Sequence, residues 1–365
     1  MPRSEESDTC LSLIASCTLN HDTFSVKFSP FTEKCVAVAG AKNFGVHGAG
    51  HVTVLQLQKN NEFEATAKFD FDGGILDVCW SELDPKRLLC AGADGTVSLC
   101  RLGKMNNTPV ARFQEHDEAA SCVAFNFIEK NSFISASFDG NLKLWDPKGS
   151  ESSLSTFYAA WPVNDASWSP HEPAEFLSCD ARGRLRIWDT RCRPTGASAL
   201  EMGNDDDEDD GGEACVLSIG AHDAEVLSCS WDAAMEHGIF SASVDGAVRY
   251  WDRRFVSSEL APVVELRGDG FTVRSMTSHP RLDGIVGAAA EDGQIIIWDD
   301  ELHNTGDRSN DGSNATGRVI ATAAHSECAT SIGFSVLCPE RVITCGWDDR
   351  VCCWELSSGL IETED

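Results

Sequence analysis

Short apolar stretches recur along the whole chain, and polar turn sequences separate them. The clearest example runs from Ser241 to Asp252 and reads Ser-Ala-Ser-Val-Asp-Gly-Ala-Val-Arg-Tyr-Trp-Asp. Asp245-Gly246 predicts a tight hairpin turn, because glycine accepts the positive φ that such turns need. Alternating apolar runs on either side of a turn indicate paired strands. The stretch therefore predicts a strand, a turn and a second strand.

The same unit is found seven times when the sequence is aligned on Trp251. Five copies carry Trp followed by Asp or Glu, whereas the first two carry Leu and Cys instead. Successive members lie 45, 45, 43, 63, 47 and 56 residues apart, at Leu55, Cys100, Trp145, Trp188, Trp251, Trp298 and Trp354. A repeat of about 40–45 residues with four short strands is typical of a β-propeller blade. We expect one all-β domain over residues 1–365, a seven-bladed propeller, and the pattern resembles the WD-repeat family.

Three segments depart from the repeat. The acidic stretch near residues 195–215 and the polar stretch near 303–317 cannot bury apolar surface, so both are expected to be disordered surface loops. The acidic stretch could dock a basic partner, but a solvated insertion is the simpler interpretation. Leu11–Leu19 predicts a strand that precedes the first blade. We expect it to complete the last blade and so to close the ring, which removes an open sheet edge.

Charge and cysteine content limit the possible partners and cofactors. The 365 residues carry a formal net charge of −29, which disfavours nucleic acid and anionic membranes and favours basic partners. The 16 cysteines show no Cys-x-x-Cys and no paired Cys/His spacing. We therefore expect free thiols in a reducing compartment, no metal and no cofactor. No apolar leader and no run of about 20 apolar residues is present, so neither a signal peptide nor a membrane span is expected.

Polar side chains recur at fixed places in several blades. The resemblance to WD repeats implies buried hydrogen-bonded clusters, one formed by His116, Asp139 and Trp145 with Ser135 or Ser137. The other would contain His222, Asp245 and Trp251 with Ser241 or Ser243. Ser, His and Asp could also form a nucleophilic triad, but a catalytic site has no reason to recur in several blades. A propeller enzyme holding a channel metal is the alternative, and we expect a protein without enzymatic activity.

A ligand would meet the face where the loops entering each blade and the Asp-Gly turns gather around the channel mouth. Aromatic residues surrounded by carboxylates suit a peptide with an apolar stripe and basic residues. The loops and turns of this face provide the expected peptide-binding residues: Asp72, Glu118, Phe138, Trp161, Glu225, Val244, Phe271, Glu291, Glu327 and Trp347. For Trp161 and Phe271, a role in covering their own blades is an equally good interpretation.

Several longer stretches resemble one group within the WD-repeat family, the peroxin-7 receptors for the type-2 peroxisomal targeting signal. The stretches are Phe28–Phe31, the glycine-rich Ala39–Gly50, Phe69–Glu82, Trp168–His171, Ala221–Trp231 and Cys345–Asp348. The two polar insertions and the missing Trp of the first two blades depart from the pattern of that group.

This resemblance implies a cytoplasmic receptor that cycles to the peroxisome, or a related organelle, and enters its matrix. The receptor would bind an N-terminal nonapeptide of its cargo, folded as an amphipathic helix across the channel face. A co-receptor and docking proteins would then deliver the complex to the membrane. A general WD-repeat scaffold in another multiprotein complex is the alternative function.

Overall fold

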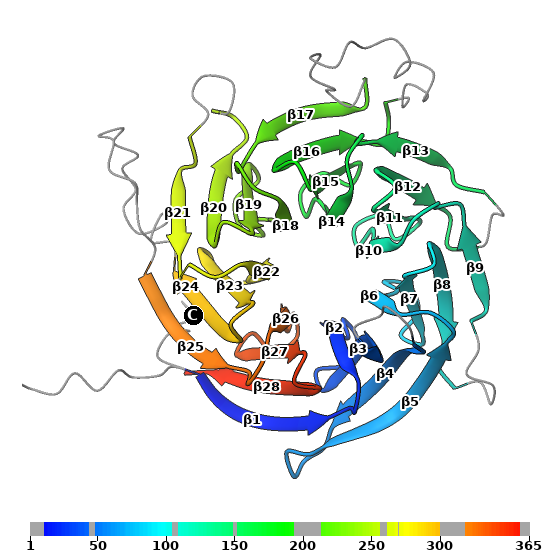
Figure 1. The fold of residues 1–365 in the computed structure, drawn as a ribbon, viewed down its shortest axis with the longest axis vertical. Helices are drawn as coiled ribbons and strands as arrows, with labels where there is room; N and C mark the ends of the chain where they lie inside the picture. Colours follow the sequence, from blue (N-terminus) through cyan, green and yellow to red (C-terminus); the bar gives the residue numbers. More distant parts are fainter. Residues whose placement is uncertain are drawn as a thin grey trace, which may run out of the picture.

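The protein forms a closed ring of seven four-stranded antiparallel sheets (Figure 1). The computed structural model describes residues 11–43, 48–103, 109–148, 152–192, 213–255, 261–268, 270–299 and 318–357. The regular elements of these ranges are all β-strands. The structure thus confirms the seven-bladed β-propeller that the repeat spacing predicts.

Each blade takes its strands from consecutive parts of the chain, except the last blade, which borrows β1. The first four blades consist of β2 (Asp22–Phe28), β3 (Cys35–Ala41), β4 (Gly50–Leu57) and β5 (Phe63–Phe71); β6 (Ile75–Trp80), β7 (Arg87–Gly92), β8 (Thr96–Arg101) and β9 (Ala111–Gln114); β10 (Ala120–Phe125), β11 (Phe133–Ser137), β12 (Asn141–Trp145) and β13 (Ser155–Tyr158); β14 (Val163–Trp168), β15 (Glu175–Asp180), β16 (Arg184–Asp189) and β17 (Cys215–Gly220). The remaining three consist of β18 (Val226–Trp231), β19 (Gly238–Ser243), β20 (Ala247–Asp252) and β21 (Val264–Arg267); β22 (Val273–Ser278), β23 (Ile285–Ala290), β24 (Gln294–Asp299) and β25 (Arg318–Ala324); β26 (Ala329–Phe334), β27 (Arg341–Gly346), β28 (Arg350–Leu356) and β1 (Leu11–Thr18).

Large side chains fill the space between neighbouring blades. The second strand of each blade is almost wholly buried, because both of its faces pack against adjacent sheets. Trp145 and Trp188, from the repeat position, are fully buried, and the ring of Trp145 lies 6.2 Å from that of Phe133. Burial of such aromatic residues is a large source of stability in a fold made of separate small sheets.

The N-terminal strand closes the ring. Strand β1 pairs antiparallel with β28, from Leu11 opposite Leu356 to Thr18 opposite Arg350, and lies outermost in the last blade (Figure 1). The strand predicted over Leu11–Leu19 is therefore present in the expected place. This pairing joins the first strand of the chain to the last and covers the edge of β28.

Hydrogen bonds between inner strands link the blades around the channel. The Asp77 carboxylate accepts a hydrogen bond from Ser25 at 2.6 Å and one from the Val123 N–H at 3.0 Å. The equivalent Asp165 accepts from the Cys229 N–H at 3.1 Å, and Ser228 donates to it at 2.9 Å. Because each carboxylate reaches a neighbouring blade, these residues stabilise the ring as well as their own sheets.

Several expectations concern residues outside the described ranges. The insertion near 303–317 lies outside them, as do residues 195–212 of the acidic insertion. Ala214 at the end of that stretch is fully buried and β17 begins at Cys215, so the last part of the expected loop belongs to the fourth blade. The fifteen described cysteines are free thiols. Among the described residues, no helix has the length and apolar character needed to cross a membrane.

Candidate functional site: the upper rim of the propeller

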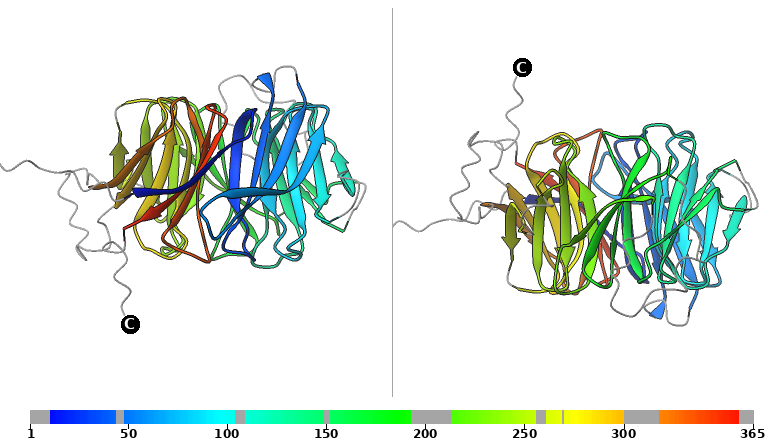
Figure 2. Two further views of the ribbon diagram at one scale, coloured as in Figure 1. Left: turned by 90° about the horizontal axis from the view of Figure 1, so that it is seen from below. Right: turned by 90° about the horizontal axis from the view of Figure 1, so that it is seen from above.

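One face of the ring is built from two sets of loops that are bonded to each other. The lead-in loop before each inner strand and the hairpin turn between the second and third strands together form what we call the upper rim. In each bonded pair, the backbone N–H of the residue before the turn aspartate donates a hydrogen bond to the backbone carbonyl of the residue that precedes the inner strand. The pairs in four blades are Phe138 with Ala119, Val244 with Glu225, Glu291 with Thr272, and Trp347 with Cys328. Figure 2 shows the ring from the side, so that its two faces lie along the upper and lower borders of each view.

Buried polar clusters support the upper rim from below. In the third blade, Nδ1 of His116 lies 2.9 Å from the Asp139 carboxylate, and Nε2 lies 2.8 Å from Ser135 Oγ. The indole N–H of Trp145 donates to the same Ser135 Oγ at 2.9 Å. Ser135 is therefore the serine of this cluster. Ser137 instead donates to the Glu118 carbonyl and holds the lead-in loop to the turn.

The cluster is repeated in two further blades. His222 contacts Asp245 at 2.9 Å and Ser241 at 2.8 Å, and Trp251 donates to Ser241 at 3.0 Å. His325, Thr344, Asp348 and Trp354 repeat the arrangement in the last blade. Ser135 and Ser241 are 0% exposed, so no substrate reaches either hydroxyl. These bonds give the clusters a structural role.

The fourth blade fills the same space with an ion pair. Arg186 and Asp180 are both buried and hydrogen-bonded to each other, and Trp188 donates to Ser178 at 2.8 Å. No histidine occupies this blade's cluster, because Ala159 stands where His116 and His222 stand in their blades. A buried Asp still requires a partner, and the guanidinium supplies it.

Exposed or partly buried apolar side chains lie on the upper rim in five consecutive blades. Each blade from the third to the seventh provides one, although the residue comes from the turn in some blades and from the lead-in loop in others. They are Phe138 (42% exposed), Trp161 (40%), Val244 (41%), Phe271 (52%) and Trp347, which is partly buried. Side chains of this size give the rim a broken apolar band.

Acidic side chains stand beside this band. Glu118 and Glu327 are exposed, as is Asp72 in the second blade. The Glu225 carboxylate is partly buried and accepts a hydrogen bond from the Asn164 amide at 2.9 Å. Glu291 lies 3.4 Å from Arg274. The acids of the rim thus differ in how free they are to meet a ligand.

The structure also shows that these residues occupy different positions in the repeat. Glu118, Trp161, Phe271 and Glu327 are equivalent, each standing two residues before its inner strand. Glu225 stands one residue later. In the second blade, Gly73 occupies the shared position, and Asp72 precedes it. The sequence analysis correctly treated Trp161 and Phe271 as equivalent. It also treated Glu225 and Asp72 as equivalent to them, although the structure places these two residues one position later and one position earlier.

Two arginines of the rim are absent from the sequence-based set. The guanidinium of Arg182 lies 4.0 Å from the ring centre of Trp161, and that of Arg274 lies 5.3 Å from the ring of Trp347. Arg182 occupies the turn position of the fourth blade where other blades carry Asp. This departure from the repeat could have identified Arg182 from the sequence. Arg274 lies on an inner strand, and the sequence does not show that its side chain turns toward the rim.

Beneath the rim, the channel forms a cavity of about 390 Å³ lined by all seven inner strands. Phe24, Leu76 and Leu227 line it near the starts of their strands, next to the upper rim. The opposite mouth is bordered by loops between the first and second strands of each blade, which we call the lower rim. Phe127 and Val336 lie at that mouth. The channel therefore connects two chemically different faces.

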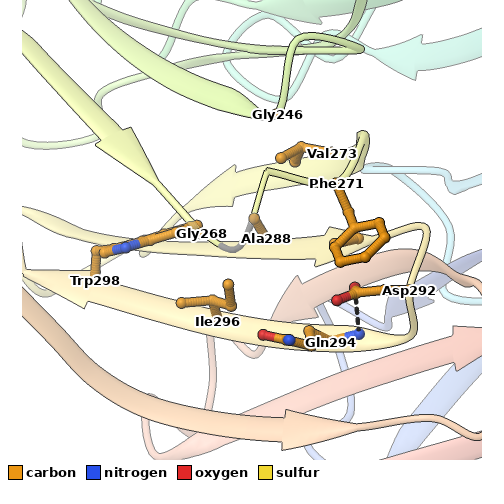
Figure 3. A pocket seen from close by; sticks show the side chains of 10 residues that line it. Gly246, Gly268, Phe271, Val273, Ala288, Asp292, Gln294, Ile296 and Trp298 are labelled. Carbon is orange, nitrogen blue, oxygen red and sulfur yellow. Dashed lines mark hydrogen bonds between the residues drawn. The ribbon is translucent and has the colours of Figure 1, made fainter.

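A small hollow lies between the fifth and sixth blades, below Phe271 (Figure 3). Phe271 and Asp292 lie at one end and Trp298 at the other, with Ala288 and Ile296 between them. Ala288 stands ten residues before Trp298, where the third blade has Ser135 before Trp145. The hollow has room for about one water molecule.

Both the fold and a family comparison define the class of protein. The WD domain, G-beta repeat family matches residues 107–146, 151–189 and 213–252. Each match covers the outer strand of one blade and the three inner strands of the next, which are the third, fourth and fifth blades. The His, Ser or Thr, Asp and Trp cluster also occurs in the last blade, outside the matched residues, and the ring contains seven four-stranded sheets. The chain is a seven-bladed β-propeller with repeats that match the WD domain, G-beta repeat family over residues 107–146, 151–189 and 213–252.

Within this class, the chain resembles receptors for the type-2 peroxisomal targeting signal. It is 24% identical to the peroxisomal targeting signal 2 receptor of Saccharomyces cerevisiae, over 91% of this chain and 96% of the relative. It is 38% identical to peroxisome biogenesis protein 7 of Arabidopsis thaliana, over 33% of this chain and 39% of the relative. It is 31% identical to the Mus musculus peroxisomal targeting signal 2 receptor, over 42% of this chain and 48% of the relative. The plant and mouse alignments thus span less than half of those relatives.

Proposed function

We propose that this protein is a peroxisomal import receptor that binds the N-terminal type-2 targeting signal of its cargo on the upper rim. The similarity to the yeast receptor over 91% of the chain supports the receptor role. The observation that supports the site is the band of one apolar side chain per blade in five consecutive blades, with carboxylates beside it. The receptor would then deliver its cargo, with a co-receptor and docking proteins, from the cytoplasm to the organelle.

The chemistry of the rim suits an amphipathic helix with basic residues. An apolar stripe on a helix buries its side chains in an apolar band, and such helix-in-groove binding uses anchors one turn apart. Glu118 and Glu327 are exposed and available to a cargo arginine, which forms its strongest pairs with carboxylates. The net charge of −29 would also steer a basic peptide toward the protein.

Binding of a synthetic peptide tests this proposal. We expect a nonapeptide with Arg and an apolar stripe to bind the purified full-length protein in a calorimetric titration with the co-receptor present. Glu118→Lys should weaken binding by about tenfold or more, because it replaces an attraction by a repulsion at the rim. Glu225→Lys should do the same, although it also removes the hydrogen bond from Asn164.

The matched control is Glu129→Lys, which makes the same charge change at an exposed position of the lower rim. It should leave the affinity within about twofold of wild type, because salt screens charges that lie far from the peptide. No binding to the folded wild-type protein would overturn the receptor proposal. Equal losses in Glu118→Lys and Glu129→Lys would instead overturn the placement of the peptide on the upper rim.

A further inference from the structure

Two buried histidines lie side by side where the first blade meets the last. His21 is in the lead-in loop of the first blade, and His51 is the second residue of β4. The two side chains belong to residues that are 5% and 6% exposed, and their ring centres lie 5.0 Å apart at an interplanar angle of 37°. Neither residue occupies a position of the repeated polar cluster, so the propeller architecture does not explain them.

Hydrogen bonds at Nδ1 fix the tautomer of both rings. Nδ1 of His51 lies 2.7 Å from a carboxylate oxygen of Asp70, and Nδ1 of His21 lies 3.2 Å from the Asp22 carbonyl oxygen. Because both partners are oxygen acceptors, each Nδ1 carries the proton and donates it. In the neutral rings, each Nε2 therefore presents a lone pair.

Both Nε2 atoms are buried and have no hydrogen-bond partner in the part of the chain that the structure describes. The other buried histidines of the rim differ. His116, His222 and His325 each use both ring nitrogens, one with a turn Asp and the other with a Ser or Thr hydroxyl. A buried acceptor without a hydrogen-bond partner is unfavourable, and two adjacent ones suit a shared ligand.

The charges around the pair favour a cation. Burial raises the pKa of the Asp349 carboxyl, and the negative charges of Asp22 and Asp348 raise it further. The carboxyl groups of Asp22, Asp348 and Asp349 therefore interact electrostatically, and His21 interacts with Asp349 in the opposite sense. Lys68 is the opposing cation, and it is paired with Asp70 at 3.4 Å.

We propose that Nε2 of His21 and Nε2 of His51 bind one divalent transition-metal ion of the Zn²⁺ type, with water in the remaining positions. Imidazole nitrogen is a preferred ligand of such ions. With Zn–N bonds of about 2.0 Å and a tetrahedral angle, two ligating rings lie about 5 Å apart, which agrees with the observed 5.0 Å. The Nδ1 bonds to a carboxylate and to a carbonyl are those that orient metal-bound histidines.

The ion would act at the closure of the ring. Thr23, two residues after His21, donates to the Gly346 carbonyl of the last blade at 2.7 Å, and Leu19 donates to the Asp349 carbonyl at 2.9 Å. An ion bound to His21 and His51 would fix this loop to β4 beside the seam. The described residues contain no cluster of three metal-ligating side chains, so water would supply the other ligands.

Zinc titration of the untagged full-length protein, freed of metal with a chelator, tests this proposal. We expect one equivalent of zinc chloride to bind in calorimetry and to raise the midpoint of thermal unfolding. His21→Gln and His51→Gln should each remove both effects. Asp70→Asn should weaken binding by about tenfold without unfolding the protein, because Asp70 only orients His51 and its side chain is 66% exposed.

His171→Gln is the control, because His171 lies on the lower rim, where its ring contacts the Asp232 carbonyl. It should leave zinc binding unchanged. X-ray absorption at the zinc edge should show only nitrogen and oxygen neighbours. A sulfur shell would mean that cysteines hold the metal and would overturn the proposal. So would an absence of binding, in which case a water molecule alone satisfies the two Nε2 atoms.

Discussion

In each buried polar cluster, a single Ser or Thr hydroxyl group connects the histidine to the tryptophan. Ser135 Oγ is bonded to both His116 and Trp145, and through His116 the chain of bonds reaches the Asp139 turn at the upper rim. The Asp139 turn at the upper rim is thus positioned by residues that are buried beneath it. Such fully satisfied buried networks make a turn rigid.

Loss of this hydroxyl should be costly. Ser135→Ala leaves the His116 ring nitrogen and the Trp145 indole N–H without a partner, so we expect a loss of about 1–3 kcal/mol in the free energy of unfolding. Chemical denaturation followed by tryptophan fluorescence measures it. Ala288→Ser is the matched reverse change, because it adds a hydroxyl where Trp298 lacks one. It should be neutral or stabilising, and a comparable loss in both variants would contradict the assigned role.

The turn carboxyl groups should make stability depend on pH. Burial raises the pKa of Asp139, but the hydrogen bond and charge of His116 outweigh it, so the pKa lies below its ordinary 3.8. A carboxyl with a lowered folded-state pKa stabilises the protein above the unfolded value, and this contribution is lost as pH falls through the folded value. The difference in unfolding free energy between wild type and Asp139→Asn should therefore shrink below about pH 3.8. A difference that stays constant from pH 6 to pH 3 would contradict this.

At the scale of elements, the seam between β1 and β28 decides whether the ring is closed. The two strands pair along their length. Leu11 of β1 lies in the core between the sixth and last blades, and Ala15 lies in the core between the last and first blades. The other blades need no such partner, because each draws all its strands from one part of the chain. Ring closure is thus the longest-range interaction of the fold.

Removal of β1 should expose the edge of β28. We expect a deletion of residues 1–19 to lower the thermal midpoint and to cause self-association, because an uncovered edge strand pairs with other chains. Differential scanning calorimetry and light scattering measure the two effects. Deletion of residues 1–10 is the control, since it leaves β1 intact. A monomeric, equally stable protein after removal of residues 1–19 would show that β1 does not hold the ring together.

Much of this could be predicted from the sequence, because blades repeat. The spacing of the seven repeat positions, five with Trp and two with Leu55 and Cys100, predicted the blade number, and the strand before the first copy predicted the closure. The sequence could not decide between Ser135 and Ser137, since residues two apart on one strand lie on the same face and only the fold shows which one meets Trp145. It also missed Arg182 and Arg274, whose stacking on rim aromatics depends on the packing of neighbouring blades.

At the scale of the whole molecule, the two faces offer different chemistry around one channel. The upper rim combines an apolar band with exposed carboxylates such as Glu118 and Glu327. The lower rim presents apolar side chains such as Leu83 and Phe127 beside charges of both signs, including Lys130 and Glu82. A basic amphipathic peptide is therefore better matched to the upper rim, and binding there as proposed would leave the lower rim uncovered.

Photo-crosslinking of a type-2 signal peptide to the wild-type protein tests this central claim most directly. The peptide carries a photoreactive group on its apolar side, and mass spectrometry locates the attached residues. We predict attachment to the upper rim, within a few residues of Phe138, Trp161, Val244, Phe271 or Trp347. Attachment confined to the lower rim, near Leu83 or Phe127, would contradict the proposed binding face.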